Sequence, residues 1–297
     1  MVRASLRSAI AAAGMIKPPI GLMSGVAALL GFAAFDPLFP PRAFAAAAGV
    51  FFLASAGTAL NCYQDRHVDA LMARTMLRPL PSGLLNGRQA LVLSLALLSA
   101  GAIFLYRSAA GIRPLLAGLG ALFLYNGVYT PLKKKTALAF FPGLICGMAP
   151  PLVGWLAAGG PLCSVKIAYL MMLYGLWQVP HTWLIYLGHR EDFRRSGMPS
   201  VVMRLSERQI KQLSSVWALH FALLCLIGRF FSLYNSLFIS LFVMINAVAV
   251  SAIFLSVFFT RGKSFSCRFL FHCINVSILI VSACIIIDPV LYSTCGI

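Results

Sequence analysis

A polar stretch that begins at Asn61 interrupts an otherwise apolar chain. Asn61, Asp65 and Asp69 are spaced four residues apart, so a helix would place all three on one face. Carboxylate and amide oxygens on one stripe suit a hard cation such as Mg2+, which proteins usually hold through one or two carboxylates together with substrate phosphates. Arg74 and Arg78 repeat the same spacing one turn further on, and guanidinium groups suit phosphate oxygens. The pattern therefore favours a metal bridged to a diphosphate substrate.

The alternative is a solvated turn between membrane helices, in which the Asp and Arg side chains pair with one another. Exposed pairs of this kind are common and contribute little to stability. The regular spacing of the three oxygen-bearing residues favours the metal site over this alternative.

Lysines form two further candidates. Lys133, Lys134 and Lys135 follow Tyr129 closely. Such a run is typical of a cytoplasmic loop, and it is also suited to binding phosphate. Lys17 precedes two prolines at the start of an apolar run, where we expect it to reach for the membrane interface rather than bind a ligand.

Two polar groups occur later in the chain. Gln178 and His181 lie three apart, on one face of a helix that contains Pro180. A single His is more often a hydrogen-bonded structural residue, but a polar pair inside an apolar run is also typical of a binding site. Glu191 and Asp192 resemble a second, weaker acidic patch, and the alternative is pairing with the neighbouring arginines at 190, 194 and 195.

These residues must be positioned by membrane helices. The chain has 297 residues, of which 60% are hydrophobic and 10% charged, with a mean hydropathy of +0.89. A soluble domain would carry about 25% charged residues, and a span needs roughly 20 apolar residues. We predict an all-α polytopic membrane protein forming a single domain over 1–297, with about nine helices around a central cavity. The expected spans are 12–33, 43–61, 89–106, 113–130, 137–157, 166–187, 213–232, 235–259 and 268–288.

Glycine and proline are concentrated in one of these spans. Residues 143–155 include Gly143, Gly147 and the pair Pro150-Pro151. Non-helical or loosened backbone is tolerated in a membrane only where protein or a cavity covers it. The composition predicts a broken or closely packed helix beside a cavity.

The formal charge of +17 is explained by topology rather than by nucleic acid, which we do not expect as a partner. If the spans alternate, nineteen of the 24 Lys and Arg residues fall on one side. The five on the other side are Arg42, Arg107, Arg113, Lys166 and Arg229. The positive-inside rule then predicts a cytoplasmic N-terminus and an external C-terminus. The acidic residues 65, 69, 191 and 192 share the cytoplasmic side, so the site should face the cytoplasm from the cell (inner) membrane.

Several motifs together resemble the UbiA-type intramembrane prenyltransferase superfamily, and within it the protoheme IX farnesyltransferase branch. The resemblance covers most of the chain and is strongest in N-x-x-x-D-x-x-x-D-x-x-M-x-R-T-x-x-R-P, from Asn61 to Pro79. Ala149–Trp155 is similar to A-x-P-P-L-x-G-W, and Trp177–His181 is similar to W-Q-x-P-H, the element that points to heme. The lysine run and Glu191-Asp192-Phe193 resemble K-R-x-T and D-D-Y of the branch.

The resemblance implies farnesyl transfer from farnesyl diphosphate to the vinyl group of protoheme IX, giving heme O with Mg2+ as cofactor. It implies that Asn61, Asp65 and Asp69 hold the metal, with Glu191 and Asp192 supporting a second one. The same three residues would be catalytic together with Arg74 and Lys133. The substrate-binding residues would be Arg78, Lys134, Tyr129, Gln178, His181 and Asp192. Association with heme A synthase or terminal oxidase assembly is a further expectation.

Two alternatives stay open at this point. One is another aromatic prenyltransferase of the superfamily, acting on a quinone precursor or a chlorin. The other is a small-molecule transporter whose broken helices line a substrate path. The transporter predicts inverted repeats, which the sequence does not display, and it has no use for an acidic stripe beside two arginines.

Overall fold

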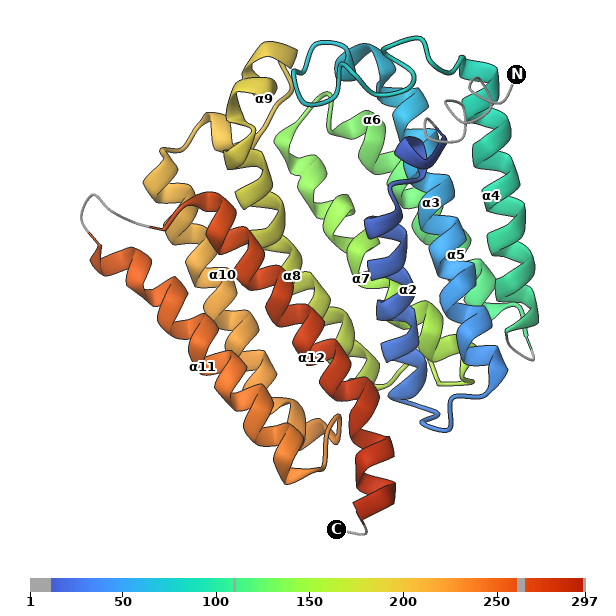
Figure 1. The fold of residues 1–297 in the computed structure, drawn as a ribbon, viewed down its shortest axis with the longest axis vertical. Helices are drawn as coiled ribbons and strands as arrows, with labels where there is room; N and C mark the ends of the chain where they lie inside the picture. Colours follow the sequence, from blue (N-terminus) through green and yellow to red (C-terminus); the bar gives the residue numbers. More distant parts are fainter. Residues whose placement is uncertain (1–11, 109–110, 261–264, 296–297) are drawn as a thin grey trace, which may run out of the picture.

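The computed structural model describes residues 12–108, 111–260 and 265–295, and these are folded into a bundle of long helices (Figure 1). In chain order the long helices are α2 (Pro18–Ala33), α3 (Pro41–Asp69), α4 (Gly87–Arg107), α5 (Arg113–Phe123), α7 (Phe140–Ala157), α8 (Val165–Gly188), α10 (Glu207–Ile227), α11 (Leu237–Phe259) and α12 (Cys267–Cys295). Shorter helices are α6 (Thr130–Leu132) and α9 (Arg190–Ser196). A π-helical segment, Leu124–Tyr129, joins α5 to α6.

Seven helices of the described ranges are long and apolar enough to cross a membrane. They are α3, α4, the continuous helix from α5 to α6, α7, α10, α11 and α12. The all-α, multi-pass prediction is therefore confirmed. The predicted first and sixth spans fall on α2, an apolar helix of 16 residues, and on α8, a helix of 24 residues. The count of nine spans stays a prediction, as does the part of the charge argument that rests on positions 3, 7, 261 and 263, outside the described residues.

Helix α3 is longer than the expected span, which ended at residue 61. It continues for two more turns, to Asp69. The acidic stripe therefore lies on the final turns of a membrane helix rather than in a loop beyond it. In Figure 1 this end of α3 lies beside α6, α9 and the loop before α4, whereas the C-terminal end of α12 lies at the opposite end of the bundle.

The expectation that Arg74 and Arg78 continue the helical stripe is wrong. The chain leaves the helix after Asp69 and runs through turns until α4 begins. The hydroxyl of Thr75 donates a hydrogen bond of 2.9 Å to the backbone carbonyl of Asp69, which satisfies an acceptor at the helix end. Pro79 has no backbone N–H to give to a continuing helix. Both arginines therefore approach the acidic residues from a loop.

Helix α7 is continuous despite Pro150 and Pro151. On one side it packs backbone to backbone against α2, because a Cβ at Gly154 would lie 1.8 Å from a carbonyl oxygen of Ala28. A Cβ at Gly31 would similarly lie 1.9 Å from the Pro151 carbonyl oxygen. On its other side α7 lines a cavity. The sequence composition thus indicated close packing and a cavity correctly, and the helix is not broken.

The cavity has a volume of about 710 Å³ and is bordered by α2, α3, α5, the π-helical segment, α7, α8 and α12. Helices α10 and α11 pack outside it, against α8 and α12, in the largest apolar core of the molecule. Buried Asp288 on α12 links that helix to the segment just before α11. Its carboxylate accepts hydrogen bonds from the backbone amides of Asn235 and Ser236, at 2.7 and 3.0 Å, just before α11 begins.

Candidate functional site

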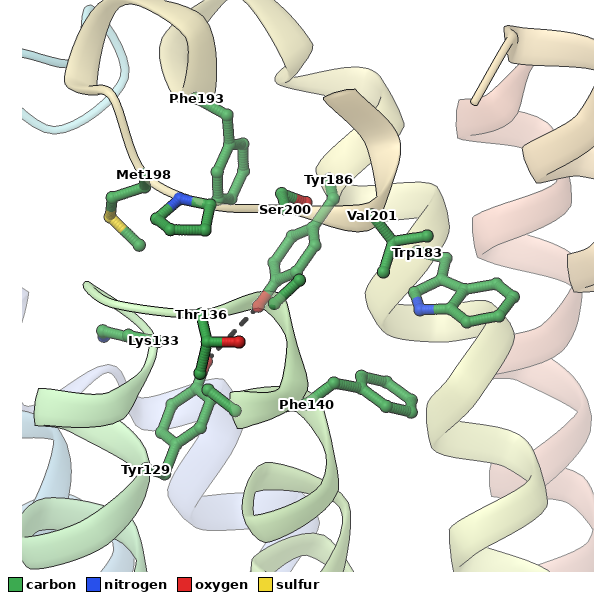
Figure 2. Close-up of a pocket in the computed structure, with 13 residues that line it drawn as sticks. Tyr129, Lys133, Thr136, Phe140, Trp183, Tyr186, Phe193, Met198, Ser200 and Val201 are labelled. Carbon is green, nitrogen blue, oxygen red and sulfur yellow. Dashed lines mark hydrogen bonds between the residues drawn. The ribbon is translucent and has the colours of Figure 1, made fainter. Parts of the chain in front are cut away.

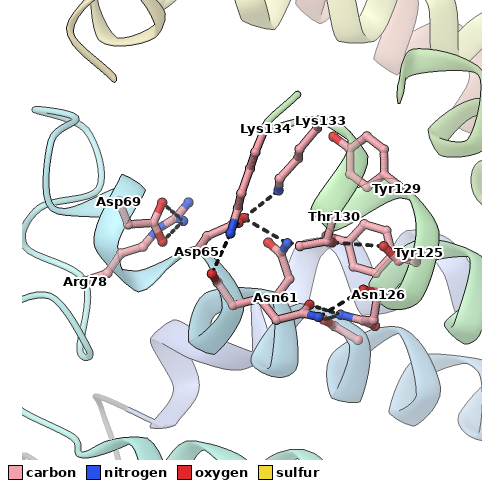
Figure 3. A network of polar contacts seen from close by, with 12 residues as sticks. Asn61, Asp65, Asp69, Arg78, Tyr125, Asn126, Tyr129, Thr130, Lys133 and Lys134 are labelled. Carbon is pink, nitrogen blue, oxygen red and sulfur yellow. Dashed lines mark hydrogen bonds and ion pairs between the residues drawn. The ribbon is translucent and has the colours of Figure 1, made fainter. Parts of the chain in front are cut away.

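Asp65 is the centre of a buried polar cluster at the end of α3 (Figure 3). Its Oδ2 lies 2.5 Å from Nζ of Lys133 and accepts a hydrogen bond of 2.9 Å from the amide of Asn61, one turn back on the same helix. Its Oδ1 lies 3.1 Å from Nζ of Lys134, which also donates to a backbone carbonyl of α3. The amide of Asn61 donates further to Thr130, at 3.0 Å. Two elements far apart in the sequence therefore meet at one carboxylate.

Asp69 lies one turn beyond, where the chain folds back on it. Nη1 of Arg78 lies 2.9 Å from Oδ1 and 2.8 Å from Oδ2 of Asp69, and the carboxylate is buried. The alternative of self-pairing between Asp and Arg is thus partly right. The part of that alternative that placed the residues in a solvated turn is wrong, because Asp65 and Asp69 are only 6% and 5% exposed.

Two more cationic residues border the cluster. Burial lowers the pKa of Lys17, and the neighbouring charges of Arg78 and Lys133 lower it further, against an opposing effect of Asp69. Burial likewise lowers the pKa of Arg74, with Arg78 adding to the effect and Asp69 opposing it.

The second acidic pair, Glu191 and Asp192 on α9, consists of two residues that differ in exposure and in bonding partners. Glu191 is half-exposed and pairs with the neighbouring Arg194 and Arg195, as its alternative proposed. Asp192 is buried, and its Oδ1 accepts a hydrogen bond of 2.9 Å from the backbone amide of Ala73 in the loop after α3. Asp192 thereby anchors the arginine-bearing loop to α9.

The donor set fits a divalent cation shared with a phosphate ligand. Oδ1 of Asp65 is a buried oxygen without a hydrogen-bond donor among the described residues, because its ion pair with Lys134 lacks hydrogen-bond geometry. Within the described part of the chain no three His, Cys, Asp or Glu side chains converge. A divalent cation at Asp65 would therefore need further oxygen ligands, such as the phosphates of a bound substrate, which Mg2+ commonly takes beside one or two carboxylates.

The charges also fit a polyanion. Five cationic side chains surround the three buried carboxylates at positions 65, 69 and 192, an excess of two positive charges. They are Lys17, Arg74, Arg78, Lys133 and Lys134. Cationic groups clustered beside buried carboxylates create a positive potential that attracts a negatively charged ligand.

A pair of tyrosines, Tyr129 and Tyr186, meets close to the lysine run, with the two hydroxyl groups pointing toward one another (Figure 2). The hydroxyl groups of Tyr129 and Tyr186 lie 3.3 Å apart, and Nζ of Lys133 lies 5.2 Å from the centre of the Tyr129 ring. Both tyrosines border the large cavity and also a small hollow of about 20 Å³ next to Lys133 and Thr136. Tyr129 belongs to the π-helical segment, a rare geometry that often occurs at functional sites.

Gln178 and His181 line the inner wall of the cavity, on α8. The amide nitrogen of Gln178 donates to the carbonyl of Gly143 at 3.1 Å, while its Oε1 is buried without a partner among the described residues. Nδ1 of His181 lies 2.7 Å from the amide oxygen of Asn275 on α12. Gln178 and His181, the predicted polar pair, therefore face the large cavity rather than lipid.

The structure brings most of the sequence-predicted residues to one end of the cavity, and it adds some that sequence reasoning missed. Tyr186 had no local signal, and Asn275 indicated only packing or a hydrogen bond between helices, because their partners are 57 and 94 residues away. Lys17 was expected to reach the interface, and it lies near enough to the cluster for the charges of Arg78, Asp69 and Lys133 to act on its pKa. Lys17, which precedes two prolines, has a left-handed backbone conformation with φ of 48°, and this is unusual for a residue other than glycine.

Known proteins match this chain over most of its length. The sequence profile of the UbiA prenyltransferase family matches residues 21–279. A protoheme IX farnesyltransferase of Oleidesulfovibrio alaskensis is 34% identical over 285 residues, which are 95% of this chain and 98% of that protein. A protoheme IX farnesyltransferase of Geobacter sulfurreducens is 41% identical over 185 residues, 62% of this chain and 68% of that protein.

Solved structures share the fold. A UbiA homolog from Aeropyrum pernix is similar with a TM-score of 0.72 at 22% identity, covering 91% of this chain and 98% of that one. A UbiA homolog from Archaeoglobus fulgidus, bound to GPP and Mg2+, is similar with a TM-score of 0.64 at 17% identity, covering 93% and 99%. At these identities the likeness concerns the fold alone.

Proposed function

The chain belongs to the UbiA prenyltransferase family, and from that premise we propose that it transfers a farnesyl group from farnesyl diphosphate to the vinyl group of protoheme IX. The product is heme O. The observation that carries the proposal is a buried cluster of carboxylates, lysines and arginines at the end of a cavity of about 710 Å³. Relatives named protoheme IX farnesyltransferase support the choice of donor and acceptor. The chain is an intramembrane enzyme, and family membership replaces the transporter alternative.

The polar cluster is the proposed diphosphate site. Asn61, Asp65 and Asp69 would hold Mg2+ through oxygen ligands, consistent with the GPP- and Mg2+-bound structural neighbour. Mg2+, when bound, would supply positive charge that makes the diphosphate a better leaving group. The cationic residues Lys17, Arg74, Arg78, Lys133 and Lys134 would bind the remaining phosphate oxygens. On binding, Lys133 and Lys134 would exchange part of their contact with Asp65 for contact with phosphate.

The tyrosine pair marks the proposed place of bond cleavage. The ester C–O bond of farnesyl diphosphate breaks there, and the electron pair leaves with the diphosphate. The resulting allylic cation forms on the apolar side of Tyr129 and Tyr186, away from bulk water that would quench it. The heme vinyl group supplies the electrons for the new C–C bond. Water then adds to the cation left on the heme side chain and loses a proton, which gives the hydroxyl group.

The cavity is the proposed site of both apolar partners. Its wall is mainly apolar, with a small number of polar groups such as Gln178 and His181 that would orient the porphyrin. Asp192 would act mainly by anchoring the loop that carries Arg74. Glu191, half-exposed and paired with two arginines, would contribute least to a second metal.

The orientation in the membrane follows from the charges. We infer that the end bearing the acidic cluster faces the cytoplasm, because Lys and Arg are concentrated in the loops predicted on that side. A cysteine-accessibility experiment with residues placed beside Arg78 and beside Asp36 would test this orientation. Labelling of the first from outside the cell would contradict it. Association with heme A synthase or oxidase assembly stays a prediction.

Purified protein incubated with hemin, farnesyl diphosphate and Mg2+ tests the proposed reaction, with products identified by mass spectrometry. Asp65→Asn should reduce the turnover number at least 100-fold, because it removes the carboxylate that two lysines and the metal would share. Asp36→Asn is the matched control. Asp36 is also paired, with Arg42 at 2.6 Å, but it lies between α2 and α3 at the other end of the bundle (Figure 1). Retained turnover in Asp65→Asn would refute the metal role. A parallel incubation in which a quinone precursor or a chlorin is prenylated while hemin is not would refute the acceptor.

A further inference from the structure

The hydrogen bond between His181 and Asn275 fixes which ring nitrogen carries the proton. Nδ2 of Asn275 donates to the backbone carbonyl of Phe271, at 2.5 Å, so the amide orientation is set. Oδ1 of Asn275 therefore faces Nδ1 of His181, at 2.7 Å. An amide oxygen only accepts hydrogen bonds, so Nδ1 of the neutral imidazole must be the donor. The lone pair of His181 is then on Nε2.

The lone pair on Nε2 of His181 is available to a ligand in the large cavity. His181 lines the cavity, and Nε2 has no hydrogen-bond partner among the described residues. The imidazole is held between two aromatic rings, with its centre 4.6 Å from that of Trp177 and 5.0 Å from that of Phe271. A neutral His whose second nitrogen donates to an oxygen acceptor is the arrangement found in metal-ligating histidines, because the donor bond fixes the tautomer and ring orientation.

We propose that Nε2 of His181 is an axial ligand of the acceptor's iron and that Asn275 is the positioning residue that holds the imidazole for it. The inference rests on the proposed function, which makes the acceptor an iron porphyrin. His181 precedes Tyr186 by five residues on α8, about 7.5 Å along the helix axis. Iron held by His181 would therefore place one edge of the porphyrin close to the tyrosine pair, where the allylic cation forms.

A plain structural bond between helices is the competing explanation, and the chain provides one for comparison. Asn246 on α11 donates to Ser277 on α12 at 2.8 Å, and neither residue lines the cavity. A structural role would make substitutions at Asn275 and Asn246 equivalent. A positioning role for an iron ligand would separate them in the spectrum of bound heme.

Hemin titration of the purified protein without farnesyl diphosphate tests the proposal, with absorption and electron paramagnetic resonance spectra as readouts. The wild type should give the spectrum of histidine-ligated heme, and His181→Ala should lose it. Imidazole added to His181→Ala should restore the signal by occupying the vacated position. Asn275→Leu should weaken hemin binding about 10- to 100-fold, the usual effect of removing the partner of a metal-ligating His. Asn275→Asp should retain ligation because a carboxylate also accepts from Nδ1, and Asn246→Leu should match the wild type.

The outcomes separate this inference from the function on which it rests. A wild-type heme spectrum in His181→Ala would overturn the axial ligand, while heme O formation would leave the proposed function intact. Equal weakening by Asn275→Leu and Asn246→Leu would overturn the positioning role. Failure of the wild type both to bind hemin and to prenylate it would overturn both proposals.

Discussion

Replacing Gly147 by alanine should displace Gln178 from its place in the cavity wall. A Cβ at position 147 would lie 1.6 Å from Oε1 and 2.4 Å from Cδ of Gln178. An ordinary contact begins at 3.4 Å, so the oxygen must move by about 1.8 Å. That movement is large enough to break the bond of 3.1 Å between the Gln178 amide and the carbonyl of Gly143.

The expected effect is on catalysis rather than on folding. Alanine favours a helix over glycine by about 1 kcal/mol, and the lost hydrogen bond costs about the same, so the melting temperature should barely change. A misplacement of about 1 Å at a reacting centre can reduce the rate about 100-fold. If Gln178 orients the porphyrin, kcat/KM for the acceptor should fall about 10- to 100-fold, equivalent to about 1.4–2.7 kcal/mol. Steady-state kinetics with varied hemin at saturating farnesyl diphosphate would measure it.

Two comparisons make the reasoning refutable. Gly120→Ala on α5 is the control, because a Cβ there has no atom within 4 Å, and its activity should equal that of the wild type. In the double variant Gly147→Ala/Gln178→Ala the clash is gone, so its kinetics should match those of Gln178→Ala alone. Wild-type activity in Gly147→Ala, or additive losses in the double variant, would show that Gln178 does not act in this way.

Three further predictions concern other parts of the molecule. Gly154→Ala places a Cβ 1.8 Å from a carbonyl oxygen of α2, so overpacking should destabilise the protein by about 1–3 kcal/mol in a thermal melt, whereas Gly120→Ala should not lower the melting temperature. Asp288→Ala removes the acceptor for two amides at the start of α11 and should lower stability by about 1–2 kcal/mol; an unchanged melting temperature would contradict the capping role. Burial lowers the pKa of Lys17, so the unfolded chain holds that proton more tightly and stability rises as pH climbs through the folded-state pKa. The same deprotonation should raise KM for farnesyl diphosphate at alkaline pH, and Lys17→Arg should shift this rise to higher pH; identical profiles would exclude Lys17 from the diphosphate site.

Local patterns in the sequence predicted the acidic stripe well. The four-residue spacing of Asn61, Asp65 and Asp69 depends only on helix geometry, and all three side chains lie on the buried face of α3. Hydropathy placed seven of the expected spans, because apolar length is also a local property. The position of Gln178 and His181 on one face of α8 follows from the same periodicity.

The contacts that these residues make with distant parts of the chain could not be predicted from local spacing. Lys133 reaches Asp65 across 68 residues, and Asn275 reaches His181 across 94. Such contacts depend on how helices pack, which spacing within one helix does not encode. Pairing of Asp with Arg was given as an alternative, but the loop that returns Arg78 to Asp69 was not predicted, because the helical spacing was extended through a segment that turns away from the helix.

The bond between Asp192 and the backbone of Ala73 affects how substitutions in the second acidic motif should be interpreted. This carboxylate links α9 to the loop that brings two arginines to the active site, so Asp192→Ala would release that loop whether or not a cation is ever held there. Glu191 has no such link and is 54% exposed. Lost turnover in Glu191→Gln would therefore report on cation binding. Lost turnover in Asp192→Ala would report first on the loss of the link between α9 and the loop after α3.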